Sequence, residues 1–271
     1  MACDVEVTSQ EGDVADLMEL ATQLYDAGVH ARPIDAFSHG DPEFDTDTGY
    51  LIQDHLLDLR HARGEVLIGA KLGIVSRAMQ CEMGIDEPVS GWLTDAMLLE
   101  PTETVRLADF SQPRVEPEIA LILDHDLDDP TTTTDDVLAA TSAALPALEV
   151  LDCRFVDYRG SAADLVADNS AAARFALGPR PIEIDRSDLR TLGCVFERNG
   201  ELVATAAGAE LLGHPAAAVA WLVRRIAARG RGLEAGMIVL TGALTCWVTV
   251  QAGDVVTAHF DQLGSVELCC V

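Results

Sequence analysis

Lysine is almost absent from this sequence of 271 residues. The 18 basic residues comprise seventeen arginines and one lysine, Lys71, in the segment GAKLGIVSRAMQ. Lysine carries a compact ammonium group whose pKa can fall on burial, which arginine does not offer. The apolar segment VLIGA before Lys71 favours partial burial. The retained lysine therefore indicates catalysis or substrate binding, the alternative being a residue that survived by chance.

Long apolar runs and paired cysteine motifs are also missing. No apolar run is long enough to cross a bilayer, and the N-terminal MACDVEVTSQEGDV lacks the basic and apolar regions of a signal peptide. The seven cysteines are odd in number and show no CxxC spacing, which favours reduced thiols over a metal site or a disulfide framework. These absences predict a soluble cytoplasmic protein.

Positive charge as a whole is scarce. The chain has 45 acidic residues and a formal net charge of −27. Such a field repels nucleic acid and anionic membranes, so neither is expected as a partner. An anionic substrate would have to be attracted locally, by a metal ion or by placed cations.

Several common site motifs are missing too. GRGLEAG does not lead from a strand into a helix, so it is not a dinucleotide loop. DHDLDDPTTTTDD lacks the glycine and the terminal glutamate of a calcium loop. The seven histidines form no HxxxH or HxH pattern, and His214, beside a predicted helix start, is expected to be structural. A GxSxG elbow is absent, although other serine triads stay open.

The periodicity of apolar residues predicts an α+β protein with a mostly β catalytic core. Amphipathic helices are expected over 14–25, 51–59 and 214–230, and another in VLAATSAAL after the capping residues TTTTDD. Strands are expected at 66–71, 114–123, 147–153, 172–177, 191–198, 201–206, 237–241, 246–250, 254–260 and 265–270. We expect a helical N-terminal region, 1–65, followed by a β-rich catalytic domain, 66–271.

An acidic pair interrupts a run that is otherwise built for burial. In PRVEPEIALIL, Glu116 and Glu118 are two residues apart, so on a strand both carboxylates project from one face. They would repel each other unless a cation or protons lie between them. Glu149 lies in a further strand-like run, LPALEVLDCRF. Three convergent carboxylates suit a hard divalent cation such as Mg²⁺ or Mn²⁺, although exposed glutamates on an edge strand give the same pattern.

Seven segments in order resemble the fumarylacetoacetate hydrolase superfamily. They are GAKLGIVSRAMQ, MGIDEP…GWLTDAM, QPRVEPEIALIL, PALEVLDCR, VADNSAAARFALG, LGHPAAAVAWL and LTGAL…AGDVVTAHFDQLGSVEL. They look most similar to the 2-hydroxypentadienoate hydratase and 4-oxalocrotonate decarboxylase branch of catechol meta-cleavage pathways, over roughly residues 45–270. The resemblance implies a β-rich mixed-sheet roll with a small helical N-terminal part, usually assembled as a homo-oligomer.

The resemblance also implies a site. Members of the family hold Mg²⁺ or Mn²⁺ through a Glu-x-Glu pair and a further acid, and the ion chelates the carboxylate and 2-oxo oxygen of a 2-oxo acid substrate. By matching motifs, the implied metal ligands are Glu116, Glu118 and Glu149, the implied catalytic lysine is Lys71, and the implied substrate-binding residues are Ser76, Asn169, Ser170 and Thr241.

One segment bears on the choice between hydratase and decarboxylase. Hydratases of this branch typically read DQPDFG, and the second aspartate is thought to move protons; here the segment is DEPVSG, with Val89 in that place. An apolar residue cannot relay protons. A 2-oxohex-3-enedioate can lose its distal carboxylate if the electrons flow to the 2-oxo group and a cation stabilises the dienolate. We therefore expect a metal-dependent decarboxylase.

Other features keep the alternatives open. QPR before the glutamate pair and LTGAL near the C-terminus look more like a hydratase, and Val75 stands where the branch usually has threonine. A hydratase of 2-hydroxypenta-2,4-dienoate, or a C–C bond hydrolase acting on another 2-oxo acid, therefore remains an alternative. Since related decarboxylases and hydratases associate with one another, a complex with a pathway hydratase is a further expectation. A structural partner that binds metal without turnover is an alternative, which the intact set of Glu116, Glu118, Glu149 and Lys71 argues against.

Overall fold

Two β-sheets form the body of the protein in a computed structural model that describes residues 6–41, 43–183 and 188–271. The helices are α1 (Glu6–Val29), α2 (Thr46–His61), α3 (Arg77–Met83), α4 (Thr134–Ala139), α5 (Ala162–Ala167) and α6 (Pro215–Ala227). The strands are β1 (Leu67–Gly73), β2 (Val89–Thr94), β3 (Arg114–Leu123), β4 (Thr141–Leu151), β5 (Ala172–Leu177), β6 (Ile182–Glu183), β7 (Gly193–Arg198), β8 (Glu201–Ala207), β9 (Ile238–Leu240), β10 (Val248–Thr249), β11 (Val255–Phe260) and β12 (Gly264–Cys269).

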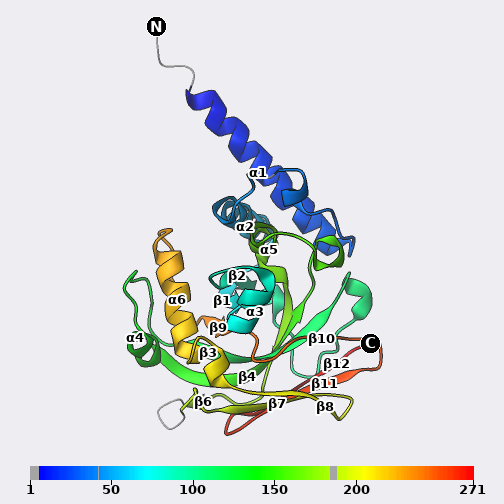
Figure 1. Cartoon of the computed structure of the whole chain (residues 1–271), viewed down its shortest axis with the longest axis vertical. Coiled ribbons are helices and arrows are strands. Elements are labelled where there is room, and N and C mark those ends of the chain that lie inside the picture. Colours follow the sequence, from blue (N-terminus) through cyan, green and yellow to red (C-terminus); the bar gives the residue numbers. More distant parts are fainter. Residues whose placement is uncertain (1–5, 42, 184–187) are drawn as a thin grey trace.

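The larger sheet is mixed and curled. Its strand order is β2-β1-β9-β3-β4-β5, with β10 added to β3 and β6 to β4. β1 and β9 run parallel, whereas β3 pairs antiparallel with both β9 and β4. The smaller sheet has the order β12-β11-β7-β8 and lies beneath the larger one in Figure 1. The α+β, β-rich mixed-sheet roll predicted from the sequence is confirmed.

Alternation along β3 and β4 gives the two faces of the larger sheet different surroundings. Val115, Ile119 and Leu121 point to the main hydrophobic core, which also takes in the buried face of α6 and the inner face of the smaller sheet. The residues between them include Ala120, which faces a smaller cluster with Phe175. Glu116 and Glu118 share this second face, because they are four and two residues from Ala120 on the same strand.

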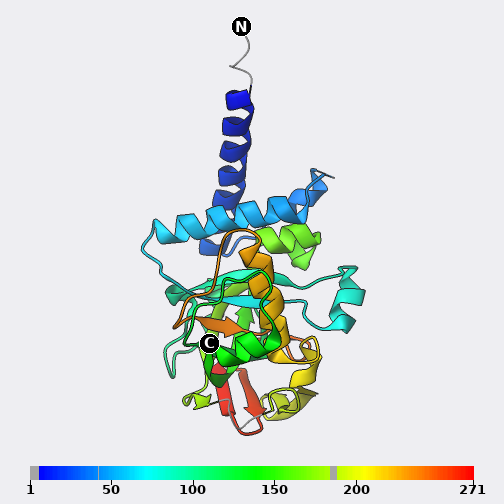
Figure 2. The same cartoon turned by 90° about the vertical axis from the view of Figure 1, so that its left-hand side faces the viewer.

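The N-terminal helices cover the end of the body near the predicted site. Leu24 of α1 and Ile52 of α2 pack in a separate hydrophobic cluster with Leu151, at the end of β4, and Phe155, which follows β4. The first turns of α1 project away from the body (Figures 1 and 2). None of the helices in the described ranges is long and apolar enough to span a membrane.

Most expected elements are present, but α3, α5 and β6 were not predicted, and two further differences concern the segment before β4 and the strand β2. The helix expected through VLAATSAAL ends at Ala139, and Thr141 already begins β4. The second half of that apolar run is therefore strand, a choice that periodicity alone does not make for a short buried run. The strand β2 was not predicted at all. The six cysteines within the described ranges are free thiols, as expected, and Cys3 lies outside those ranges.

The prediction that His214 is structural is confirmed by its contact at the start of α6. Its Nδ1 accepts a hydrogen bond from the backbone N–H of Ala216 at 3.0 Å, so the imidazole caps the helix. Burial lowers the pKa of His214 below its ordinary 6.5. The negative charge of Asp188 raises this pKa, and the positive charge of Arg190 lowers it. Lowering of the pKa keeps the capping nitrogen unprotonated at neutral pH.

The first prediction concerns this cap. A protonated Nδ1 cannot accept, so the stabilisation by the cap is complete above pH 6.5 and is lost as the pH falls through the lowered pKa. We expect His214→Ala to reduce the free energy of unfolding at neutral pH by about 1 kcal/mol, whereas His214→Asn retains the cap and removes its pH dependence. Urea titrations at several pH values measure this, and equal stability of the two variants would contradict the capping role.

Candidate metal centre

Three carboxylates meet at one point of the larger sheet. Glu116, Glu118 and Glu149 each offer an oxygen, and the three oxygens lie within 4.8 Å of one another. The exposed fractions of the three residues are 6%, 0% and 1%. The convergence expected from the sequence is therefore present, and it is buried rather than displayed on a solvated edge.

Strand register explains why these three residues meet. Glu116 and Glu118 lie on the same face of β3 by alternation. Glu149 of β4 is the direct cross-strand partner of Glu116. Like charges directly opposite each other destabilise a sheet, so the pairing needs a compensating cation.

Lys71 supplies one such charge from β1. Its Nζ lies 3.0 Å from Oε2 of Glu149 and donates to the backbone oxygen of Ser170 at 3.0 Å. Burial alone lowers the pKa of the ammonium, but the attraction of Glu149, Glu116 and Glu118 outweighs burial, so the pKa of Lys71 lies above its ordinary value. The single lysine is thus a permanently charged ammonium at neutral pH and not a neutral amine.

The pKa values of the three carboxylates are raised as well, mainly by burial. Burial raises the pKa of Glu116 to about 8, with Lys71 opposing and Glu149 reinforcing the rise. Burial, then repulsion from Glu149 and Glu116, raises the pKa of Glu118 well above its ordinary value. The pKa of Glu149 is also raised, by burial, although Lys71 counteracts it. One ammonium does not neutralise three buried acids.

Unused acceptor oxygens indicate what would complete the cluster. Oε2 of Glu118 accepts the backbone N–H of Gly242 at 2.6 Å, but its Oε1 and the Oε1 of Glu149 are buried without a hydrogen-bond partner in the described part of the chain. Buried polar atoms are normally paired, and exceptions need a reason. An all-oxygen donor set with free lone pairs fits a hard divalent cation such as Mg²⁺, Mn²⁺ or Ca²⁺.

A strained segment holds the partner of Lys71 in place. Asn169, Ser170 and Ala171 are consecutive non-glycine residues with φ of 52°, 53° and 58°, in the left-handed region that such residues rarely adopt. The side chain of Asn169 fixes the segment to β2, because its Oδ1 accepts from the N–H of Trp92 at 2.7 Å and its Nδ2 donates to the oxygen of Trp92 at 2.9 Å. Asn169 is therefore a positioning residue in this geometry.

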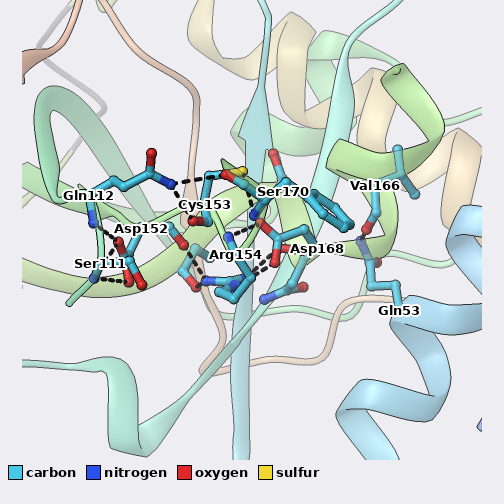
Figure 3. A network of polar contacts seen from close by, with 12 residues as sticks. Gln53, Ser111, Gln112, Asp152, Cys153, Arg154, Val166, Asp168 and Ser170 are labelled. Atoms are coloured by element: carbon cyan, nitrogen blue, oxygen red, sulfur yellow. Dashed lines mark hydrogen bonds and ion pairs between the residues drawn. The ribbon is translucent and has the colours of Figure 1, made fainter. Parts of the chain in front are cut away.

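A buried ion pair supports the same segment from the other side. Arg154 binds the carboxylate and the backbone oxygen of Asp168, and its Nη1 donates to the backbone oxygens of Asp152 and Ala172 at 2.7 and 3.0 Å. Figure 3 shows this network, in which Asp152 also accepts from the N–H groups of Ser111 and Gln112. The network joins the chain before β3, the end of β4 and the strained segment.

A cavity of about 600 Å³ opens beside the cluster. Four predicted site residues line it: Lys71, Ser76, Glu116 and Ser170. Glu118, Glu149, Asn169 and Thr241 do not belong to its lining. The Thr241 hydroxyl donates to the backbone oxygen of Ile119 at 2.8 Å, and Ser76 Oγ accepts from the N–H of Met79 at 3.2 Å to cap α3.

Other lining residues were not predicted from the sequence. Arg114, Tyr158 and Trp247 come from three separate segments, and they meet at the wall of the cavity. The position of Arg114, two residues before Glu116 on the same strand face, is the signal that would have identified it. Nothing in the sequence connects Tyr158 or Trp247 with it.

With this geometry established, comparison with known proteins identifies the class. The family model described as fumarylacetoacetate (FAA) hydrolase, C-terminal, matches residues 70–271. The chain belongs to the fumarylacetoacetate hydrolase family.

Its relatives divide between two activities. It is 38% identical to a 2-keto-4-pentenoate hydratase of Paraburkholderia xenovorans over 248 residues, which are 92% of each chain. It is 34% identical to a 4-oxalocrotonate decarboxylase of Pseudomonas putida over 250 residues, 92% of this chain and 95% of the relative. The solved structure of the 4-oxalocrotonate decarboxylase from Pseudomonas putida G7, complexed with magnesium and adipate, matches with a TM-score of 0.92 and 33% identity over 95% of this chain and 98% of that one. The predicted branch of the family is thus confirmed.

The second prediction concerns the charge of the cluster. Without metal, the folded state keeps protons that the unfolded chain releases above pH 4.5, so stability falls as the pH rises toward 8. Metal binding requires ionised carboxylates, so stabilisation by Mg²⁺ should grow over the same interval. Melting temperatures measured against pH, with chelator and with Mg²⁺, test this. Glu116→Gln should reduce both the pH dependence of stability without metal and the pH dependence of the stabilisation by Mg²⁺. A metal effect independent of pH would contradict the raised pKa.

The third prediction concerns Asn169. Asn169→Ala leaves a buried N–H and a buried oxygen of Trp92 without partners, so we expect the free energy of unfolding to fall by about 2–4 kcal/mol. Ser142→Ala is the control, because that hydroxyl is exposed and donates a single bond to the oxygen of Ile122; the expected change is within about 0.5 kcal/mol. Urea unfolding of both variants gives the comparison, and equal losses would exclude the positioning role.

Proposed function

We propose that this protein is a divalent-metal-dependent lyase that decarboxylates an unsaturated 2-oxo dicarboxylate of the 2-oxohex-3-enedioate type. Support comes from the buried cluster of Glu116, Glu118 and Glu149 beside Lys71. The similarity to hydratases and to decarboxylases limits the reaction to the chemistry of small 2-oxo acids. We propose Mg²⁺ or Mn²⁺ as the cofactor and a homo-oligomer as the assembly.

The three glutamates would hold the cation. When bound, it supplies Lewis acidity to the 2-oxo group and stabilises the negative charge that develops there. Fully ionised, the cluster and Lys71 carry a net charge of −2, because three carboxylates face one ammonium. One divalent ion brings this total to zero, which permits an anionic substrate to approach.

Lys71 would act through its ammonium. Decarboxylation breaks the bond to the distal carboxylate, moves that electron pair through the double bond to the 2-oxo oxygen, and releases CO₂. The raised pKa of Lys71 keeps its proton on Nζ at neutral pH, so the group stabilises the enolate oxygen by hydrogen bonding rather than acting as a base. Ser170 fixes the direction of Nζ.

The apolar side chain of Val89 favours decarboxylation over hydration. It is buried on β2 opposite Gly73, in the position where hydratases of this branch carry a proton-relaying aspartate. A Cβ built on Gly73 would lie 3.1 Å from Val89 Cγ2, 2.5 Å from Ser170 Oγ and 3.7 Å from Lys71 Nζ. The methyl group of Val89 and the ammonium of Lys71 therefore both border the space beside Gly73, and an apolar side chain there supplies no acid or base for hydration.

A hydratase is the second candidate, and one observation favours it. Identity to the hydratase of Paraburkholderia xenovorans is 38%, against 34% for the decarboxylase of Pseudomonas putida.

The fourth prediction separates the two reactions. Purified protein, depleted of metal and then restored with Mg²⁺, should release CO₂ from 2-oxohex-3-enedioate and leave 2-hydroxypenta-2,4-dienoate unchanged. Lys71→Met should lower the rate by about 10²–10⁴-fold, the range of a positioned proton or charge donor, while the fold measured by circular dichroism is retained.

Two outcomes would contradict the proposal. Consumption of the dienoate without CO₂ release would assign the hydratase. CO₂ release that is unchanged by chelation would exclude the metal-dependent reaction. Val89→Asp is the matched variant, because it introduces the missing carboxylate; gain of hydration by this variant would attribute the choice of reaction to that position.

A further inference from the structure

We propose that Arg114 binds the distal carboxylate of the substrate and makes the cavity selective for dicarboxylates. This inference rests on the proposed function, because it takes the other end of the substrate to be held at the glutamate cluster. It assigns a role in substrate recognition to Arg114, whose charge also attracts the carboxylate of Glu116.

The position of Arg114 suits a second anchoring point. It begins β3 two residues before Glu116, and both residues line the cavity. Alternation puts the two side chains on the same strand face. Two residues of a strand span roughly 6.6 Å, comparable with the length of an extended six-carbon chain. A substrate held at Glu116 by one end would therefore reach the neighbourhood of Arg114 with the other.

Aromatic contacts hold the guanidinium without using its donors. Its Cζ lies 3.5 Å from the centroid of the Tyr158 ring and 4.4 Å from that of the Trp247 ring. Stacking engages the faces of a guanidinium and leaves its in-plane N–H groups free. No hydrogen bond or ion pair joins the Arg114 side chain to another residue in the described ranges. The in-plane N–H groups of the guanidinium are thus free to donate to a planar acceptor, and a carboxylate can accept two of these hydrogen bonds at once.

Further contacts fix the orientation of this arrangement. The Tyr158 hydroxyl donates to the backbone oxygen of Gln112 at 3.1 Å. The N–H of Gln112 donates in turn to Asp152 at 2.6 Å, within the network of Figure 3. A ring fixed in this way limits the loss of conformational freedom when Arg114 binds a ligand.

A comparison of the cationic residues that line the cavity also favours Arg114. The lining contains three cationic residues in the described part of the chain: Lys71, Arg114 and Arg159. Lys71 is already paired with Glu149. Arg159 is exposed and makes no ring contact in the described part of the chain, so water screens its charge. In a chain of net charge −27, Arg114 is therefore the ordered cation available to a second carboxylate.

The fifth prediction compares two unreactive ligands that differ by one carboxylate. With Mg²⁺ present, calorimetry should show that the wild-type protein binds 2-oxohexanedioate roughly 10–100-fold more tightly than 2-oxohexanoate, as one charge-assisted bidentate contact provides. Arg114→Gln should abolish this preference, because it should weaken the binding of 2-oxohexanedioate far more than that of 2-oxohexanoate. Arg159→Gln is the matched control, a second cavity cation whose loss should leave the preference intact.

Each alternative outcome is decisive. The inference is overturned if the wild-type protein shows no preference, if Arg114→Gln retains it, or if Arg159→Gln removes it equally. Wild-type CO₂ release reports separately on the proposed function: a preference that depends on Arg114 in a protein without CO₂ release would sustain dicarboxylate recognition and refute the decarboxylase.

Two further variants keep the test valid if Arg114→Gln does not fold. Arg114→Lys preserves the charge but not the fork, so the preference should fall between those of the wild type and the glutamine variant. Trp247→Ala removes a ring that is 39% exposed, so the core is not disturbed, and should weaken binding of the dicarboxylate alone. Undiminished preference in both variants would refute the role of the stacked fork.

Discussion

The desolvation of three carboxylates beside a single ammonium is the constraint on which this structure depends. Removing ionised groups from water is expensive, and mutual attraction offsets the expense only when charges are balanced and their lone pairs are used. Glu116, Glu118 and Glu149 with Lys71 do not satisfy either condition by themselves, as the raised pKa values and unpartnered oxygens show. A cluster of this kind is unfavourable for folding and favourable for binding a cation.

The surrounding elements are arranged to make that unfavourable cluster persist. β3 and β4 present the glutamates from adjacent strands, and their opposite faces are anchored in the main core. The strained segment at Ser170 is held by Asn169 on one side and by the Arg154–Asp168 pair on the other. Strain of this type survives only where neighbouring contacts determine the backbone, and it is found preferentially at functional sites.

Much of the fold and the ligand set could be predicted from the sequence, because both follow from short-range periodicity. The alternation in PRVEPEIALIL places Glu116 and Glu118 on one face without knowledge of the partner strand. The pairing of Glu116 with Glu149 could not be derived in this way, since register between strands is set by the hydrophobic faces and the turns. Resemblance to a family provided it instead.

The failures have the same origin. The run through Thr141 is short and mostly apolar, so it gives no clear period by which to separate helix from strand. Arg114 was overlooked because its surroundings are assembled from Tyr158 and Trp247, which are distant in sequence and show no motif. The substrate-binding role of Thr241 stays a prediction; its hydroxyl donates to the backbone oxygen of Ile119.

The near-absence of lysine gives the molecule a property of practical value. Lys71 is the only lysine side chain in the sequence, and it is 1% exposed. Reagents that acylate or reductively alkylate amines therefore find no accessible side-chain target on the folded surface. Modification of the ε-amino group requires that Lys71 become exposed. The rate of this modification would therefore measure how often the cavity opens.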